Sequence, residues 1–193
     1  MDQAHWQYFI SLERDLEATV PFVEPVEDNF STYSIEFAKI LLSASSEVDV
    51  VCRVLGKEID PSARPDNINE HRKLILSKYP KFPQLGVLMP RYGHAFLPWK
   101  AWASGGNPDW WSSYNDVKHK RYRHFPDANL RNGIYSLAGL LSVLVYLYRD
   151  DLERLSLHPW PSLLDIQTRS TALPFQNKFI IPDFEPEPVS GRT

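Results

Sequence analysis

The sequence predicts a mainly α-helical fold, a bundle of about five helices with an irregular insertion rich in proline and aromatic residues. Three observations lead to this fold class. Two long segments carry apolar residues at steps of three and four, which is the spacing of one helix face. Prolines gather between these segments, and no internal repeat is visible. The length of 193 residues suits one domain with a sizeable core.

The two strongest helix predictions lie at 32–57 and 127–150. A single apolar stripe runs along the first, and Ser31 or Thr32 is expected to cap its start. Asp127 is expected to cap the second, where apolar residues on nearly every side predict a central helix. We expect these two helices to pack lengthwise as the core pair.

Three shorter helices are expected around this pair, over about 3–20, 67–79 and 108–124. The first carries apolar residues at near-helical spacing and ends before two prolines. Asn67 precedes the second, which is ended by Pro80. The third opens at Asn107–Asp109, because asparagine caps helices, proline suits the first position and aspartate complements the helix dipole.

Residues 80–108 form the insertion, and their five prolines exclude a long helix. Two apolar segments flank Pro90–Gly93, a pattern that predicts either a small β-hairpin or an irregular aromatic-rich loop. Residues 1–157 are then the helical bundle domain. Residues 158–193 are a proline-rich extension that packs on the bundle, contains a short strand or extended segment at 177–181, and frays at its end.

Composition argues against several classes of function. The net charge of −3 indicates neither a strongly basic nucleic-acid-binding protein nor an acidic tail, so a basic function must be local. Cys52 is the single cysteine, which rules out an internal disulfide and a cysteine-based zinc site. The apolar stretch at 134–147 is shorter than the roughly 20 residues of a membrane span, and the N-terminus lacks a secretory pattern. We therefore expect a cytoplasmic protein with no membrane partner.

The motifs of common cofactor sites are absent from the sequence. It contains no Walker loop and no GxGxxG, GxSxG or HExxH pattern, so no cofactor is predicted. His94, His124 and His158 are scattered without the spacing of metal ligands, so no metal site is predicted either.

The segment 110–124 is the least ordinary part of the chain. Seven consecutive residues of it hold four cations and two histidines, namely Lys118, His119, Lys120, Arg121, Arg123 and His124. At 100° per residue, Asn115, His119 and Arg123 share one edge of a helix. Lys118 and Arg121 point into its aromatic sector.

Two interpretations of this segment stay open. In the first, the charges extend past aromatic rings on a solvated helix and have a structural role alone. In the second, they converge on phosphate beside aromatic residues that suit single-stranded nucleic acid. His119 and Arg123 are then the candidate catalytic residues. Asn115, Lys118 and Arg121 are the candidate phosphate-binding residues.

Glu47 lies at the edge of the apolar stripe on the helix predicted at 32–57. If this face meets the aromatic sector of the later helix, charges of opposite sign come together at the border of the core. Because a buried charge needs a partner, Glu47 is expected to form a salt bridge with Lys118 or Arg121. The pair would hold the register of the two helices more than it adds net stability.

The sequence resembles a family of uncharacterised bacterial helical proteins. The resemblance is carried by Asn-Phe-Ser-Thr-Tyr-Ser at 29–34 and by Trp-x-x-Tyr-Asn-x-Val-Lys-His-x-Arg at 111–121, and it covers about residues 6–148. More distantly, the pattern is similar to the HEPN superfamily of helical bundles. That resemblance implies homodimers and roles in toxin–antitoxin modules, phage defence and RNA cleavage.

Active HEPN proteins carry an Arg-x-x-x-x-His type of motif, in which arginine stabilises phosphate charge and histidine transfers a proton without metal. In this chain the order of the two residue types around 118–123 is reversed. Arg64 and His71 match in the forward order, but they span a predicted loop and helix start, and we interpret them as coincidental.

The leading hypothesis is an RNA- or nucleotide-associated protein of defence or toxin type, with metal-independent ribonuclease activity an open question. The alternative is a non-catalytic interaction or dimerisation domain that uses the aromatic insertion and the last long helix.

Overall fold

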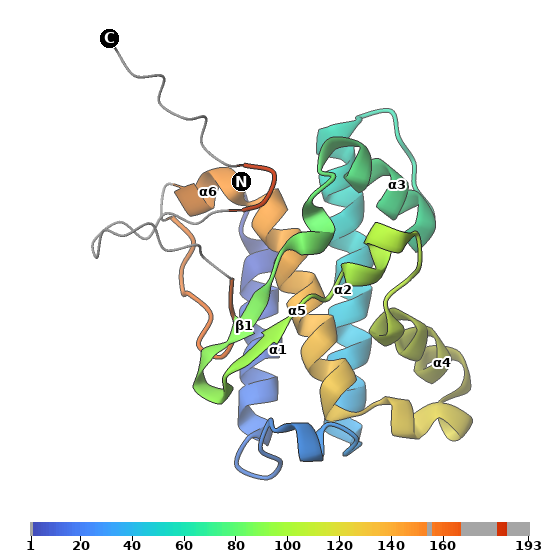
Figure 1. The fold of residues 1–193 in the computed structure, drawn as a ribbon, viewed down its shortest axis with the longest axis vertical. Coiled ribbons are helices and arrows are strands. Elements are labelled where there is room, and N and C mark those ends of the chain that lie inside the picture. The colour runs from blue at the N-terminus through green and yellow to red at the C-terminus, as the bar shows by residue number, and fades with distance from the viewer. Residues whose placement is uncertain (1, 154–155, 167–180, 185–193) are drawn as a thin grey trace.

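The computed structural model describes residues 2–153, 156–166 and 181–184, which form a mainly helical fold with one small antiparallel sheet (Figure 1). The predicted fold class is confirmed. The helices of the described residues are α1 (Ala4–Thr19), α2 (Ile35–Ile59), α3 (Ile68–Lys78), α4 (Asp109–His124), α5 (Leu130–Leu147) and α6 (Arg149–Glu153). The strands are β1 (Val87–Met89), β2 (His94–Phe96) and β3 (Asp165–Ile166).

Helices α2 and α5 pack side by side along their length and form the centre of the molecule, as predicted (Figure 1). Helices α1 and α3 cover further parts of α2, while α4 lies across both central helices. Helix α5 is long and apolar enough to cross a membrane by length and composition. It is also 89% buried inside the protein, and a core helix shows the same property.

The caps of the two central helices differ from the predicted ones. The hydroxyl of Ser34, and not Ser31 or Thr32, accepts the capping hydrogen bond from the backbone of α2. The reason is that α2 begins at Ile35, which makes Ser34 the residue directly before the helix. Asn129, and not Asp127, caps α5, since residues 125–127 form a separate 3-10 turn. Asn67, the residue before α3, caps that helix.

Helix α4 begins and continues differently from the prediction. Its start has no side-chain cap, because Asn107 instead lies against Arg72 of α3. Its helical geometry breaks at Lys120, where φ is −141° and ψ is 43°. The step of four residues from His119 to Arg123 crosses this break, so the two side chains no longer follow one edge of a regular helix.

The insertion forms the β-hairpin that was one of the two predicted outcomes. Strands β1 and β2 pair with Val87 opposite Phe96, and β3 pairs with the other edge of β1. Gly93 closes the turn with a φ of 69°, a conformation that favours glycine. Beyond the hairpin, Trp99 and Trp102 are each 1% exposed, so the aromatic insertion belongs to the core.

The described part of the C-terminal extension packs on α1 and α5. The indole N–H of Trp6 donates to the carbonyl of Pro159 at 2.9 Å, and Tyr146 donates to Asp183 at 3.0 Å. Glu13, 1% exposed, accepts three hydrogen bonds from backbone N–H groups of residues 162–164. The short strand expected at 177–181 and the expected frayed end lie outside the described residues, apart from Ile181.

Candidate nucleic-acid interface and ligand pocket

The cations predicted from the sequence form an exposed surface at the C-terminal end of α4. We call this the basic surface, and it consists of Lys118, His119, Lys120, Arg121, Tyr122 and Arg123, all of them exposed. Tyr122 has 80% of its surface open to solvent. Within residues 2–153, 156–166 and 181–184, none of the four cations forms an ion pair with a carboxylate. Their positive charge is therefore not neutralised by the described part of the protein.

Three of these cations lie against aromatic rings. The ammonium group of Lys118 donates to the hydroxyl of Tyr114 at 3.1 Å. The guanidinium of Arg123 lies 5.3 Å from the ring centre of Tyr122, and that of Arg121 lies 5.4 Å from the ring of Phe125. Such contacts orient a cation without cancelling its charge. The structural interpretation of this segment and the anion-binding one are thus compatible.

The predicted edge of Asn115, His119 and Arg123 is not assembled into one hydrogen-bonded group. Asn115 is half-buried and donates its side-chain amide to the carbonyl of Trp111, one turn earlier in α4. His119 is exposed and forms no hydrogen bond or ion pair with the described residues. Arg123 follows the break at Lys120.

The salt bridge predicted for Glu47 is wrong. Glu47 pairs with the imidazole of His5 on α1, and not with Lys118 or Arg121. The two cations are exposed on α4 and need no buried partner. The prediction assumed that the Glu47 side of α2 meets α4, but at this position α2 faces α1.

The Arg64 and His71 match does not form a site. His71 is completely buried, and its Nε2 lies 3.1 Å from a carboxylate oxygen of Asp49. Arg64 points to its own loop, where it donates to the carbonyls of Pro61 and Ala63. Burial lowers the pKa of His71, although Asp49 acts in the opposite direction.

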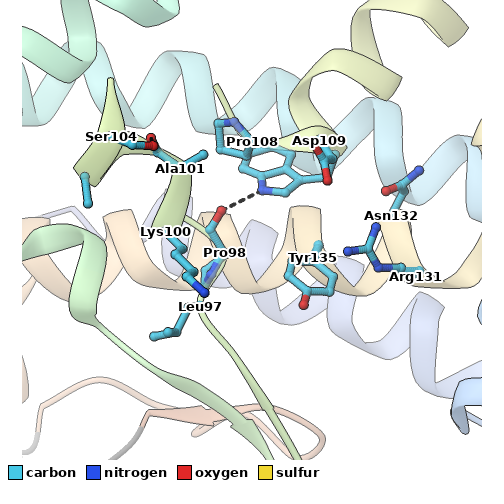
Figure 2. Close-up of a pocket in the computed structure, with 12 residues that line it drawn as sticks. Leu97, Pro98, Lys100, Ala101, Ser104, Pro108, Asp109, Arg131, Asn132 and Tyr135 are labelled. Carbon is cyan, nitrogen blue, oxygen red and sulfur yellow. Dashed lines mark hydrogen bonds between the residues drawn. The ribbon is translucent and has the colours of Figure 1, made fainter. Parts of the chain in front are cut away.

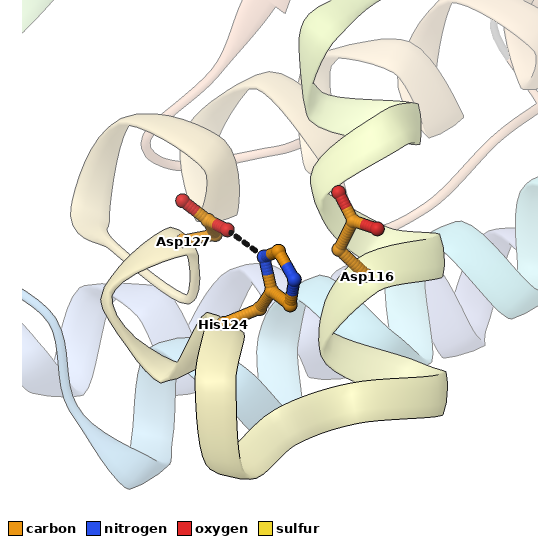
Figure 3. A group of neighbouring side chains, drawn as sticks. All are labelled: Asp116, His124 and Asp127. Atoms are coloured by element: carbon orange, nitrogen blue, oxygen red, sulfur yellow. Dashed lines mark hydrogen bonds and ion pairs between the residues drawn. The ribbon is translucent and has the colours of Figure 1, made fainter.

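A second polar cluster arises where the chain turns after α4 (Figure 3). His124 hydrogen-bonds through Nδ1 to Asp127 at 2.9 Å, and Asp116 of α4 lies beside this pair. One nitrogen or oxygen from each of the three residues lies within 4.8 Å of the others. Imidazole and carboxylate are ligands of zinc and manganese, so these residues are the ones able to hold a metal in the described part of the chain. Sequence spacing did not predict this set, because the break at Lys120 brings His124 back towards Asp116.

A pocket of about 540 Å³ lies between the N-terminal ends of α4 and α5 and the 3-10 turn at Lys100–Ser104 (Figure 2). Its polar side chains gather around Tyr135. Figure 2 shows Lys100 on one side of this ring and Arg131 on the other, and Asp109 and Asn132 line the same pocket. The residues of this site come from three separate segments and match no motif, so the sequence alone does not predict it.

The wall of the pocket depends on one close contact inside the core. Trp110 lies across Gly139 of α5, where a Cβ atom would come within 2.7 Å of the indole ring. The indole N–H donates to the carbonyl of Pro98 at 2.9 Å, which joins α4 to the insertion (Figure 2). Glycine at position 139 therefore allows the apolar wall to form.

Comparison with known proteins identifies no relative: no family model, no curated protein and no solved structure matches the chain. The family resemblance described from the sequence thus stays a prediction. The basic surface and the pocket are the two features of the described residues that bear on function.

Proposed function

We propose that this protein binds single-stranded RNA through the basic surface at the end of α4. The observation that carries the proposal is the set of four cations without carboxylate partners in the described residues, gathered around an 80% exposed tyrosine. Cations beside an exposed aromatic ring suit a single strand, since the cations contact phosphates and the ring stacks on a base.

The chemistry of the surface favours a single strand over a duplex. Tyr122 presents a flat ring on which an unpaired base can stack, whereas the bases of a duplex are already stacked on each other. Arg121 and Arg123 are held over neighbouring rings, which lowers the entropy lost when they bind phosphate. The net charge of −3 for the chain makes this local concentration of positive charge more selective.

The proposal covers binding and not cleavage. A general base works when its imidazole is held in one orientation near the proton that it removes. His119 has no hydrogen-bond partner among the described residues, so nothing in that part of the chain orients its ring. We expect His119→Ala to retain RNA binding, and inspection of the bound RNA for shortened products tests cleavage separately.

Salt-dependent binding of a fluorescent twelve-nucleotide oligouridine tests the proposal. Each phosphate contact contributes a slope of about −0.7 to the logarithm of affinity against the logarithm of salt. Arg121→Ala and Arg123→Ala should each weaken binding and reduce this slope by about 0.7. Tyr122→Ala should weaken binding about tenfold, since stacking contributes about 1–3 kcal/mol per base.

The controls are matched exposed residues outside the basic surface. Arg14→Ala on α1 and Lys57→Ala on α2 each remove one positive charge and should leave affinity and slope nearly unchanged. If Arg14→Ala and Lys57→Ala weakened binding as much as Arg121→Ala and Arg123→Ala do, the attraction between RNA and protein would be non-specific. Absence of oligouridine binding at low salt would contradict the proposal.

An interaction domain is the second candidate, and different residues now favour it. The aromatic insertion and α5, which were expected to supply the partner surface, are buried in the core. Exposed apolar side chains occur instead around the connection between α1 and α2, where Phe22 is 87% exposed, Ile35 56% and Tyr33 51%. Light scattering of the wild type and of Phe22→Ser tests whether this region mediates self-association.

A further inference from the structure

The pocket beside Tyr135 combines charges of both signs that do not neutralise each other. Lys100, Asp109 and Arg131 all line it, yet none of the three forms an ion pair with any described residue. The ring of Tyr135 holds the guanidinium of Arg131 at 4.9 Å from its centre. All three are exposed and therefore solvated in the free protein, and a ligand with both an anionic group and hydrogen-bond donors would complement their charges.

Size and shape narrow the class of ligand. The volume of about 540 Å³ falls within the roughly 300–1,000 Å³ typical of pockets for small molecules and cofactors. Pro98 and Trp110 supply an apolar wall, and Tyr135 supplies an aromatic ring. Such surfaces suit a planar heterocycle better than a flexible polar chain. A nucleotide has the planar base, the anionic phosphate and the size that this pocket requires.

The position of the cations indicates where the phosphate lies. Lys100 and Arg131 lie on opposite sides of Tyr135 in Figure 2, and both line the pocket, so its positive charge is concentrated around this ring and attracts a phosphate group there. The start of α4 lines the pocket as well, but its first residue is Asp109, whose carboxylate offsets the positive end of the helix, so the attraction for an anion comes from the two cations.

The carboxylate of Asp109 indicates which base is selected. A carboxylate only accepts hydrogen bonds, so it pairs best with two adjacent N–H donors. Guanine carries such a pair at N1 and its 2-amino group, whereas adenine and cytosine present a ring-nitrogen acceptor beside their amino group. In uracil the single ring N–H lies between two carbonyl oxygens. Asn132, which is 6% exposed and bonded to the carbonyl of Asp127, adds a fixed polar group beside Asp109.

We propose that the pocket between α4, α5 and Lys100–Ser104 binds a guanine nucleotide. Asp109 accepts from the N–H edge of the base, and Lys100 and Arg131 hold the phosphate. This site is separate from the basic surface and uses none of its residues. The nucleotide is either free in solution or stands at the 5′ end of an RNA, and the recognition chemistry is the same.

Calorimetric titration of the full chain with GMP, AMP and guanosine tests the proposal. GMP should bind about tenfold more tightly than AMP, in line with the discrimination of one bidentate base contact. It should also bind about tenfold more tightly than guanosine, which lacks the phosphate. Asp109→Asn should remove the preference for GMP over AMP, and Lys100→Ala should lower GMP affinity towards that of guanosine, with Arg131 retaining part of the phosphate contribution.

Two variants serve as controls, and a second titrant identifies the source of the nucleotide. Asp28→Asn and Lys57→Ala change exposed residues of the same types outside the pocket and should leave GMP binding intact. If a 5′-phosphorylated RNA that begins with guanosine displaces bound GMP, the natural ligand is an RNA end. If this RNA does not displace GMP, the natural ligand is the free nucleotide. Both results support the site.

The proposal is overturned if GMP, AMP and guanosine bind equally, or if Asp109→Asn and Lys100→Ala leave GMP affinity unchanged. The oligouridine used to test the basic surface contains no guanine. A failure of RNA binding there is therefore distinguishable from a failure of nucleotide binding here.

Discussion

The imidazole of His71 is completely buried between α2 and α3, with Nε2 near Asp49 and with Nδ1 lacking a hydrogen-bond partner. Removing a polar ring from water without satisfying both nitrogens has a cost, and that cost rises when the ring is protonated. Burial therefore lowers the pKa of His71 below its ordinary value of 6.5, and the attraction of Asp49 only partly compensates.

This shift predicts how stability depends on pH. Below about pH 6.5 the unfolded chain binds a proton at His71 that the folded chain does not, so the free energy of unfolding should fall as the pH drops. Above that value the contribution is constant. The free energy of unfolding, measured by urea denaturation at several pH values between 5 and 7, should fall less steeply with decreasing pH in His71→Gln than in the wild type. If the free energy of unfolding changed equally with pH in the two proteins, His71 would not be the source of the pH dependence.

At the scale of an element, α5 owes its central position to its small residues as well as to its apolar ones. Gly139 and Gly133 both lie on this helix, but they face different neighbours. A Cβ at position 139 would come within 2.7 Å of Trp110, whereas one at position 133 would meet only ordinary contacts at 3.9 Å and beyond. One glycine is required by packing and the other is not.

Gly139→Ala should consequently destabilise the protein by about 1–3 kcal/mol, the usual cost of overpacking a core. Gly133→Ala should be neutral or stabilising by up to about 1 kcal/mol, because alanine favours helix over glycine. Urea denaturation measures both values. The same Gly139→Ala protein should bind GMP more weakly, since Trp110 forms a wall of the pocket. Equal stability changes for the two variants would contradict the packing argument.

At the scale of the whole molecule, the C-terminal extension is tied to the bundle through a buried carboxylate. Glu13 on α1 accepts backbone hydrogen bonds of 2.8–3.0 Å from Ser162, Leu163 and Leu164. β3, which follows at Asp165–Ile166, then joins the edge of β1. One acidic side chain thus joins α1 to the segment that continues into the sheet as β3.

Loss of this carboxylate should affect the whole protein. Glu13→Ala leaves three backbone N–H groups without their partner and should lower the free energy of unfolding by about 3 kcal/mol. Glu17→Ala is the matched control. Glu17 accepts one hydrogen bond from the hydroxyl of Ser162 at an exposed site, so its loss should cost less than about 0.5 kcal/mol. A similar small effect for both variants, measured by thermal or urea unfolding, would disprove the role of Glu13.

The pattern of apolar residues in the sequence was sufficient to predict the fold class and the pairing of α2 with α5. These features depend on helix periodicity and on contacts between residues close in the chain, which are visible in the sequence. The clustering of cations at 118–123 and their position on α4 were equally local and were predicted.

The tertiary structure alone decided which distant residues meet. Glu47 pairs with His5 because α1 lies against that side of α2, and sequence periodicity does not specify which neighbour a helix side faces. The break at Lys120 brings His124 to Asp116, and three separate segments assemble the pocket around Tyr135. Helix periodicity is set within a few residues, whereas a site made from several segments depends on how the whole chain packs.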